Sequence, residues 1–353
     1  MYRVLELPSS RTLSWDVSTR TLPDAFERYL AGIADLYDVA DVSETDRRNF
    51  FNTTTATLSP SGSIGQGRSV RQTLARGPTT LRRSDVDGLN IFINRTALIG
   101  DCDGRPVDAQ PGALQFRDMS RPSTSRFDSV DVMTVLVPRH IVPLVLLRPD
   151  IHGLVIPPES PGVRLIQAQM ITLLDLADDL GEAELETAVQ ALLLVASHIA
   201  GARVSVGGPE LAALQGAVRR AAAEYVEGRI DALDLPINID AVAHAGGVSR
   251  ATLYRAFDGE GGVNRYIQDR RLHQARSALR RRRGASPTIA EISHDYGFAS
   301  PNHFSRLFRT RYGYSPSEVS GPEASPGISM SSGPMRHDIL GAWLRDPRKG
   351  DGL

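Results

Sequence analysis

The feature that most constrains this chain is an internal repeat near its carboxyl end. Residues 239–257, IDAVAHAGGVSRATLYRAF, align with residues 289–308, IAEISHDYGFASPNHFSRLF. The offset between the copies is 50 residues before the central turn and 51 after it, because Ala299 is an extra residue in the second turn. A pattern that recurs at this spacing predicts one small folding unit used twice.

Each copy carries the signals of two short helices joined by a tight turn. Gly247 and Gly297 permit the positive φ that such a turn often needs. The apolar residue after each glycine anchors the turn in the core. Ser249 or Ser300 then caps the second helix, and Pro301 suits a first helical position. This combination predicts two helix–turn–helix motifs.

The second helix of each motif is amphipathic. Leu253 and Phe257 are four residues apart, as are Phe304 and Phe308, and these pairs predict the buried face. The opposite face is expected to contact DNA. The residues expected to contact bases or phosphates, including one at the start of a following helix, are Arg250, Ala251, Thr252, Tyr254, Arg255, Pro301, Asn302, Ser305, Arg306, Arg309 and Ser317.

Arginine carries the strongest expectation, because its guanidinium can donate two hydrogen bonds to O6 and N7 of guanine in the major groove. A single exposed arginine is usually a solvated surface charge, but Arg255 and Arg306 recur at the same place in both copies. Tyr254 is equally compatible with groove contact and with surface packing. Asn302 and Ser305 are compatible with base or phosphate contact.

A long helix is predicted between the two motifs. Residues 263–283 carry apolar residues at helical spacing over about 20 residues, which corresponds to ~30 Å. Such a helix can hold the motifs about one DNA turn (~34 Å) apart. The run 280–283, RRRR, either pairs with the dipole at the helix end or contacts phosphate. Residues 315–318, SPSE, predict a further helix start, where free N–H groups near Ser317 can hold a phosphate.

Charge is divided along the chain. Residues 212–320 hold 16 arginines and 11 acidic residues, a net charge of +5, whereas the remainder carries −6. The net charge of −1 for the whole chain hides this division. The basic region coincides with the repeat, which favours nucleic acid as its partner.

Length and composition exclude several other classes. A chain of 353 residues is too long for one typical domain and fits two. Its one cysteine, Cys102, excludes a disulfide scaffold and a multi-cysteine metal site, and fits a reducing, cytoplasmic environment. An alkyl-transfer enzyme fused to DNA-binding helices would need a reactive cysteine, and Asp101 and Asp103 disfavour the thiolate of Cys102.

Metal and membrane partners are not expected either. His244 and His294 recur in the repeat, but no further ligand lies at metal-binding spacing, so packing or helix-end roles are favoured. Apolar runs are far shorter than the ~20 residues of a spanning helix, and the start of the chain lacks the apolar core of a signal peptide. We therefore expect no metal, no cofactor and no enzymatic activity.

The region before the repeat predicts two further parts. Residues 1–160 are rich in Thr, Ser, Gly and Pro, with short apolar runs between turns such as Asp103-Gly104, which predicts an antiparallel β domain. Residues 59–67 are expected to form a mobile loop, because they hold three glycines and three serines. Residues 161–208 show helical apolar spacing and predict a segment for dimerisation or signal relay.

The fold class expected is α+β. An antiparallel β domain with flanking helices precedes an all-α DNA-binding domain with two helix–turn–helix motifs at residues 209–320. Residues 321–353 are expected to form a mobile tail with one short amphipathic helix.

The motifs within residues 209–320 resemble the double helix–turn–helix domain of the AraC/XylS family. The resemblance rests on VSRATLYRAF at 248–257, GVNRYI at 262–267, RRL at 270–272, AR at 275–276, IAEI at 289–292, GF at 297–298, HFSR at 303–306 and GYSP at 313–316. It implies a transcription regulator, usually an activator, that binds double-stranded promoter DNA and acts with RNA polymerase. It also implies that the outward residues of both second helices contact the DNA, although Ala251 and Pro301 offer only van der Waals contact.

The N-terminal half resembles the cupin-like sensor domain of one branch of this family. The resemblance rests on DCDGR at 101–105, PGAL at 111–114, SRP at 120–122 and VPR at 137–139. It implies a small-molecule effector, such as an aromatic acid or amine, and a homodimer. Metal cupins use clustered histidines, but this half has only His140, His152 and His198, with no His-x-His pair.

An alternative remains open at this stage. The N-terminal domain of a ligand-independent regulator would serve only dimerisation or contact with another protein. A pocket lined by mixed apolar and polar groups would favour the effector, whereas an interior filled with side chains would favour the alternative.

Overall fold

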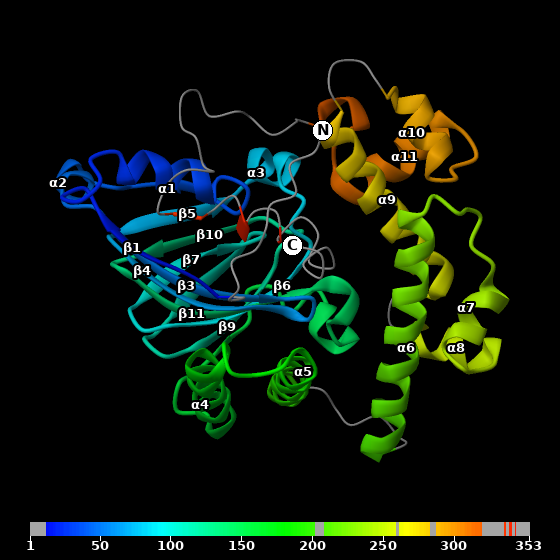
Figure 1. Cartoon of the computed structure of the whole chain (residues 1–353), viewed down its shortest axis with the longest axis horizontal. Helices are drawn as coiled ribbons and strands as arrows, with labels where there is room; N and C mark the ends of the chain where they lie inside the picture. The colour runs from blue at the N-terminus through cyan, green and yellow to red at the C-terminus, as the bar shows by residue number, and fades with distance from the viewer. Residues whose placement is uncertain are drawn as a thin grey trace. The chain divides into compact units, whose positions relative to one another are not determined.

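The computed structural model describes residues 12–201, 208–258, 261–282, 287–319, 335–336, 339–340 and 343, with only the backbone of 208–214. The chain divides into two compact units (Figure 1). The first unit comprises Met1–Ala202 with Ser325–Leu353, and the second comprises Arg203–Ala324.

Two antiparallel sheets form the framework of the first unit, as the sequence predicts. The larger sheet has the strand order β1 (Thr12–Ser18), β3 (Phe51–Ser59), β4 (Gly62–Ser69), β11 (Val130–Pro138), β6 (Gly88–Asn94), β9 (Leu114–Asp118) and β12 (Val155–Ile156). The smaller sheet has the order β2 (Asp38–Ala40), β5 (Gln72–Arg76), β10 (Ser123–Phe127), β7 (Leu98–Cys102) and β8 (Arg105–Ala109). The predicted Asp103-Gly104 turn joins β7 and β8, with φ of 57° and 81° at these residues.

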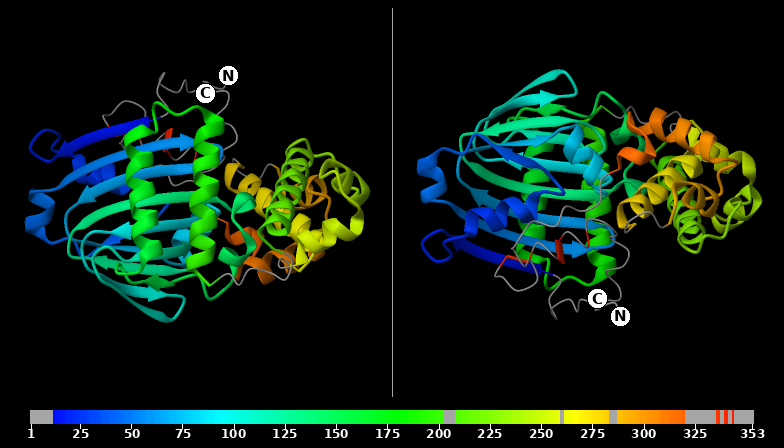
Figure 2. Two further views of the ribbon diagram at one scale, coloured as in Figure 1. Left: turned by 90° about the horizontal axis from the view of Figure 1, so that it is seen from below. Right: turned by 90° about the horizontal axis from the view of Figure 1, so that it is seen from above.

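Alternation along the strands gives the larger sheet two different faces. Ile91, Phe116 and Val135 point to one face and are fully buried beneath α4 (Pro161–Leu176) and α5 (Glu182–Ile199). Figure 2 shows α4 and α5 side by side across this outer face of the sheet. Burial of each such side chain contributes about 1.5–3 kcal/mol, so both helices are integral to the first unit.

The segment expected to be a mobile loop is instead strand β4. Gly62–Ser69 pairs with β3 on one side and β11 on the other. A Cβ at Gly65 would lie 2.8 Å from the carbonyl oxygen of Thr55, so this close approach of two backbones requires glycine. The prediction was wrong because glycine and serine carry no strand signal of their own, and neighbouring strands supply the pairing.

Short helices and part of the tail complete the first unit. The helices are α1 (Ala25–Ile33), α2 (Glu44–Arg48) and α3 (Pro78–Arg83), with short 3-10 turns at Arg139–Ile141 and Leu144–Leu147. Met335, Ile339 and Trp343 are buried in the same apolar cluster as Trp15 and Phe50. The Trp343 indole N–H donates to the Ser59 carbonyl at 3.0 Å. The expectation of a mobile tail is therefore wrong for these tail residues, and most of the others lie outside the described residues.

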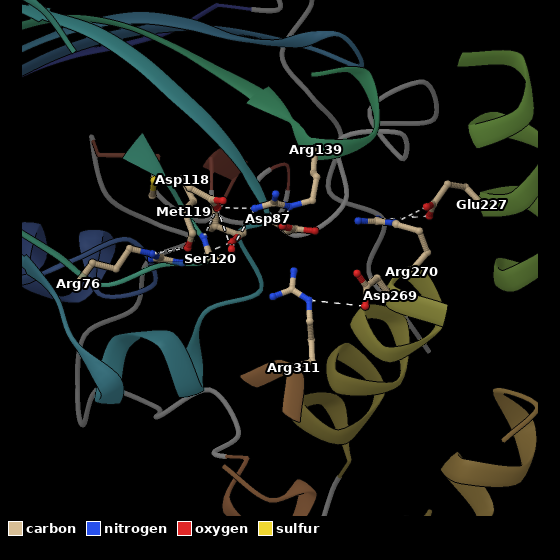
Figure 3. A network of polar contacts seen from close by, with 11 residues as sticks. Arg76, Asp87, Asp118, Met119, Ser120, Arg139, Glu227, Asp269, Arg270 and Arg311 are labelled. Carbon is tan, nitrogen blue, oxygen red and sulfur yellow. Dashed lines mark hydrogen bonds and ion pairs between the residues drawn. The ribbon is translucent and has the colours of Figure 1, made fainter. Parts of the chain in front are cut away.

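A polar network holds the ends of three strands together (Figure 3). The Arg139 guanidinium contacts the carboxylates of Asp87 and Asp118, and its Nη2 donates to Ser120 Oγ at 3.0 Å. Burial alone would raise the pKa of Asp118, but the charge of Arg139 and hydrogen bonds from Ser120 and Arg139 outweigh it and lower the pKa. Ser120 and Arg139 belong to the segments that resemble the cupin-like domain. Their role in this structure is to link the ends of neighbouring strands.

The second unit is entirely helical. Its helices are α6 (Gly208–Asp231), α7 (Ile239–Ala245), α8 (Arg250–Ala256), α9 (Val263–Arg281), α10 (Ile289–Asp295) and α11 (Pro301–Tyr312), followed by the 3-10 turn η4 (Pro316–Glu318). Two apolar cores occupy this unit, one under each helix–turn–helix motif. Helix α9 contributes Val263 and Ile267 to the first core and Leu272 and Leu279 to the second. The long connecting helix expected from the sequence is thus shared by both motifs.

None of the helices in the described part of the chain has the length and apolar character needed to cross a membrane.

Replacing Trp343 with alanine tests the contribution of the tail. Trp343→Ala is expected to lower the free energy of unfolding of the first unit by ~3–5 kcal/mol, because it leaves a cavity. The chain has two tryptophans, and both Trp15 and Trp343 lie in this unit, so the fluorescence of Trp15 reports its unfolding in urea.

The matched control is Arg71→Ala, which breaks an exposed ion pair with Asp128 in the same unit. It is expected to change the free energy of unfolding by less than ~1 kcal/mol. An unchanged urea midpoint for Trp343→Ala would show that the tail adds no stability.

Candidate nucleic-acid interface and internal cavity

The sequence repeat is also a repeat of backbone geometry. Gly247 and Gly297 have φ of 64° and 70°. Their N–H groups donate to the carbonyls of His244 and His294 at 2.9 and 2.8 Å. The next residue in each copy donates to the carbonyl five positions earlier, at 3.0 and 2.9 Å. Both histidines close the turn through their main chain, and their side chains are exposed.

Serine caps fix where each second helix begins. Ser249 Oγ accepts from the N–H of Thr252 at 3.3 Å, and Ser300 Oγ accepts from the N–H of His303 at 3.2 Å. The helices that follow differ in length, because α8 has 7 residues and α11 has 12. We call α8 and α11 the recognition helices.

The structure separates the two faces of the recognition helices as the sequence predicts. Leu253, Phe257, Phe304 and Phe308 are fully buried in the two cores. The residues expected to contact DNA lie away from these cores. Exposed positions are Arg250, Ala251, Tyr254, Arg255, Pro301, Asn302, Arg306, Arg309 and Ser317, and partly buried ones are Thr252 and Ser305.

The predicted arginines differ in what they already contact. Arg250 forms a two-point ion pair with Asp240 at the start of α7. Arg255 turns back on its own helix, where Nη2 donates to Thr252 Oγ1 at 3.2 Å. For the side chains of Arg306 and Arg309, the structure records no hydrogen bond or ion pair with another described residue. The exposed face of α11 therefore offers two uncommitted guanidinium groups.

Two other predicted phosphate contacts are less open than expected. The helix start near Ser317 is the three-residue turn η4, and the Ser315 N–H donates to the Glu318 carboxylate at 2.7 Å. The same carboxylate accepts from Ser315 Oγ at 2.7 Å, so the cap of this turn is already satisfied by the protein. At the end of α9, Arg280 is buried and Arg281 is exposed, whereas Arg283 lies outside the described residues.

Sequence reasoning missed two arginines that connect α9 to other helices of the second unit. Arg271 Nε donates to the Tyr296 carbonyl at 2.6 Å, and its guanidinium lies 4.6 Å from the centre of the Phe298 ring. Arg270 forms a buried ion pair with Glu227 of α6 (Figure 3). Both arginines stand in the RRL segment at 270–272, but their roles depend on contacts with distant helices.

The first unit contains a cavity between its two sheets. Its volume is about 210 Å³, and residues from both sheets and from α1 line it. Five of the lining side chains are aromatic: Trp15, Tyr29, Tyr37, Phe92 and Phe127. Hydroxyl and amide side chains contribute polar atoms. An apolar cavity with a few polar groups is typical of a small-molecule site.

Arg117 is the one charged residue among the described residues that line this cavity. Sequence reasoning did not single it out. The signal was present in the strand LQFRD at 114–118, because Leu114 and Phe116 face the helices and the alternate residues Gln115 and Arg117 therefore face inward.

Neither Cys102 nor a metal cluster forms a reactive centre in the described residues. Cys102 is buried, and burial is the main cause that raises the pKa of its thiol. Within the described ranges, no group of three or more His, Cys, Asp or Glu side chains is placed to hold a metal ion.

Known proteins match both units. Residues 242–321 match the family model of a helix-turn-helix domain, and residues 67–202 match that of an AraC-binding-like domain. The transcriptional activator NphR of Rhodococcus sp is 24% identical over 262 residues, which cover 70% of this chain and 74% of NphR.

Other matches are shorter or more distant. The HTH-type transcriptional activator RhaS of Escherichia coli is 36% identical over 85 residues, which are 24% of this chain and 30% of the length of RhaS. The crystal structure of the AraC-like transcriptional activator CuxR aligns with 80% of this chain and 99% of its own, at 19% identity and a TM-score of 0.49.

The two turn glycines allow a matched test of the motif geometry. Gly247→Ala is expected to cost about 1–2 kcal/mol, because alanine disfavours positive φ and nothing else lies near the added methyl group. Gly297→Ala is expected to cost more, because its Cβ would lie 3.0 Å from Arg271 Nη2 and 3.2 Å from Leu235. Thermal unfolding followed by circular dichroism of the full chain would measure both, and equal losses would contradict the tight packing of the second turn.

Proposed function

The chain belongs to the AraC family of transcriptional regulators, and we propose that it binds promoter DNA sequence-specifically through α8 and α11 and activates transcription under the control of a small effector. It is a DNA-binding regulator and not an enzyme. The observation that carries the proposal is the pair of recognition helices, each capped by serine and each presenting an exposed polar face.

The mechanism follows from how α9 joins the two motifs. Its 19 residues correspond to about 28 Å at 1.5 Å per residue, which suits two helices in consecutive major grooves. Arg306 and Arg309 project from α11 without internal partners in the described residues, so they are available for bases and phosphates. Arg255 would exchange its contact with Thr252 for a base, whereas Arg250 would first have to leave Asp240.

The cavity supports control by an effector over the ligand-independent alternative. A β domain that served only dimerisation would be expected to have an interior filled with side chains. Here the interior keeps a volume of about 210 Å³ lined by apolar and polar groups. The AraC-binding-like match over residues 67–202 includes much of its lining.

Dimerisation and contact with RNA polymerase complete the proposal. Helices α4 and α5 carry the exposed apolar side chains Leu165, Ile171, Leu176 and Leu194, of which Leu194 is 72% exposed. Exposed apolar side chains on this packed pair of helices suit a homodimer interface. NphR and RhaS are transcriptional activators. If this chain is also an activator, it would contact RNA polymerase.

The Arg306→Ala variant tests the role of α11. It is expected to weaken binding to the protein's own promoter by ~1–3 kcal/mol and to relax specificity at one base pair, because a two-point guanine contact is lost. Footprinting of the DNA upstream of the protein's own gene, followed by competition with single-base variants, measures both effects. Arg255→Ala is expected to do the same in the other half of the footprint.

The control is Arg68→Ala, which removes an exposed arginine of the first unit and should leave the footprint unchanged. Equal weakening of Arg306→Ala on specific and random DNA would show that Arg306 contacts only phosphate.

The Leu194→Glu variant tests the dimer. Sedimentation of the full chain is expected to show a shift from dimer to monomer, because a charge would be placed inside an apolar interface. Ile99→Glu is the control, since Ile99 is also exposed but lies on β7 of the smaller sheet. An unchanged dimer for Leu194→Glu would place the interface elsewhere.

A further inference from the structure

Two arginines of the first unit are almost completely buried among its described residues, and their surroundings differ. Arg76 is 1% exposed and Arg117 is 2% exposed. Arg76 donates through Nε to the Met119 carbonyl at 2.6 Å, through Nη1 to the Leu36 carbonyl at 2.7 Å and through Nη2 to Ser84 Oγ at 2.9 Å. All three nitrogens of Arg76 are therefore satisfied by the protein, and its role is structural.

Arg117 is much less well satisfied. Its Nη2 donates to Gln115 Oε1 at 2.9 Å and its Nη1 to the carbonyl of the preceding residue at 3.1 Å. Its Nε is buried and has no hydrogen-bond partner in the described structure. The neighbouring carboxylate, Asp118, points to Arg139 and Ser120 instead. No described carboxylate forms an ion pair with Arg117, so its charge is buried without a counter-ion.

The charge of Arg117 faces the cavity. The guanidinium carbon lies 5.2 Å from the centre of the Phe92 ring, which also lines the cavity. Burial lowers the pKa of Arg117, but an arginine stays protonated at neutral pH. The described lining contains no Asp or Glu side chain. A buried cation that no protein group neutralises is stabilised by an anion brought from outside.

A second hydrogen-bond donor lies within the electrostatic reach of Arg117. Burial raises the pKa of Tyr37, and the charges of Arg76 and Arg117 act against this effect, so the phenol keeps its proton at neutral pH. The Tyr37 hydroxyl contacts Met119 Sδ at 3.8 Å and also interacts with the side chain of Asn90. Asn90 is paired with Arg117 across β6 and β9 and also lines the cavity. These groups give an anion neutral donors beside one positive charge.

We propose that the cavity binds a monocarboxylate with a compact aromatic body, and that the carboxylate forms an ion pair with Arg117. This inference rests on the proposed function, in which an effector occupies the first unit. It narrows the effector to an acid and excludes an amine, because a protonated amine would meet the charge of Arg117 with no acidic partner.

The volume of the cavity and the single charge of Arg117 both support an aromatic monocarboxylate as the ligand. A cavity of about 150 Å³ is known to hold benzene, so a cavity of about 210 Å³ has room for one ring and a carboxylate. The aromatic lining suits a planar apolar body. A phosphate would carry up to two negative charges, and one arginine would leave the second uncompensated.

The experiment compares three ligands of similar shape on the full chain: phenylacetate, phenylacetamide and phenethylamine. Isothermal titration calorimetry without DNA is expected to show binding of phenylacetate. Phenylacetamide is expected to bind about 10- to 100-fold more weakly, because it lacks the charge-assisted hydrogen bonds, and phenethylamine not measurably.

Two substitutions separate ligand binding from folding. Arg117→Met keeps an apolar chain of similar length and is expected to lower the affinity for phenylacetate to that for phenylacetamide. Its thermal midpoint without ligand is expected to equal or exceed that of the wild type, because an unpaired buried charge is removed. Arg76→Met is the matched control and is expected to lower the thermal midpoint, because three donors to main-chain and serine oxygens are lost.

Several outcomes would overturn the inference. These are equal binding of phenylacetate and phenylacetamide, no measurable binding of phenylacetate at millimolar concentration, and a preference for acid that Arg117→Met leaves unchanged. The footprint with and without phenylacetate tests the proposed function separately. If phenylacetate binds but changes neither the footprint nor promoter activity, the carboxylate site is supported and control by an effector is contradicted. If phenethylamine changes the footprint and phenylacetate does not bind, control by an effector is supported and the carboxylate site is contradicted.

Discussion

The geometry of the DNA-binding unit depends on helix α9, which is buried in two separate apolar cores. Tyr266 and Ile267 close the core under the first motif, and Leu272 and Leu279 close the core under the second. One rigid helix therefore belongs to both cores, so its length and pitch largely set the separation of the recognition helices. The buried pair of Arg270 with Glu227 fixes α9 against α6, and loss of either partner would leave a buried charge at a cost of ~3–5 kcal/mol.

The first unit combines a stable fold with an internal cavity. Its larger sheet gains stability on the outer face, where the fully buried Ile91 and Val135 pack beneath α4 and α5. The inner face carries small residues such as Ala56 and Gly67, which leave room for the cavity. Helices bound to one face of a sheet thus allow the other face to remain incompletely filled.

Features that depend on local physics could be predicted from the sequence. Turn glycines, serine caps and four-residue apolar spacing all act within a few residues, so both motifs and the position of α9 were predicted. Strand β4 was missed, because its backbone pairs with β3 and β11 rather than following a side-chain pattern. The buried Trp343 was missed because its hydrogen-bond partner, Ser59, lies 284 residues away. Arg117 looks ordinary in the sequence, because only the assembled cavity reveals that it lacks a counter-ion.

The two motifs have the same backbone geometry, but the arginines on their exposed faces differ in their internal contacts. In α8, Arg250 is held by Asp240 and Arg255 by Thr252, so contact with DNA must first break these interactions. In α11, which is five residues longer, Arg306 and Arg309 have no such partners in the described structure. A donor without an internal partner can bind a ligand without first breaking another interaction. Arg306 and Arg309 are therefore free to meet a ligand at once, whereas the two arginines of α8 must first exchange an internal partner.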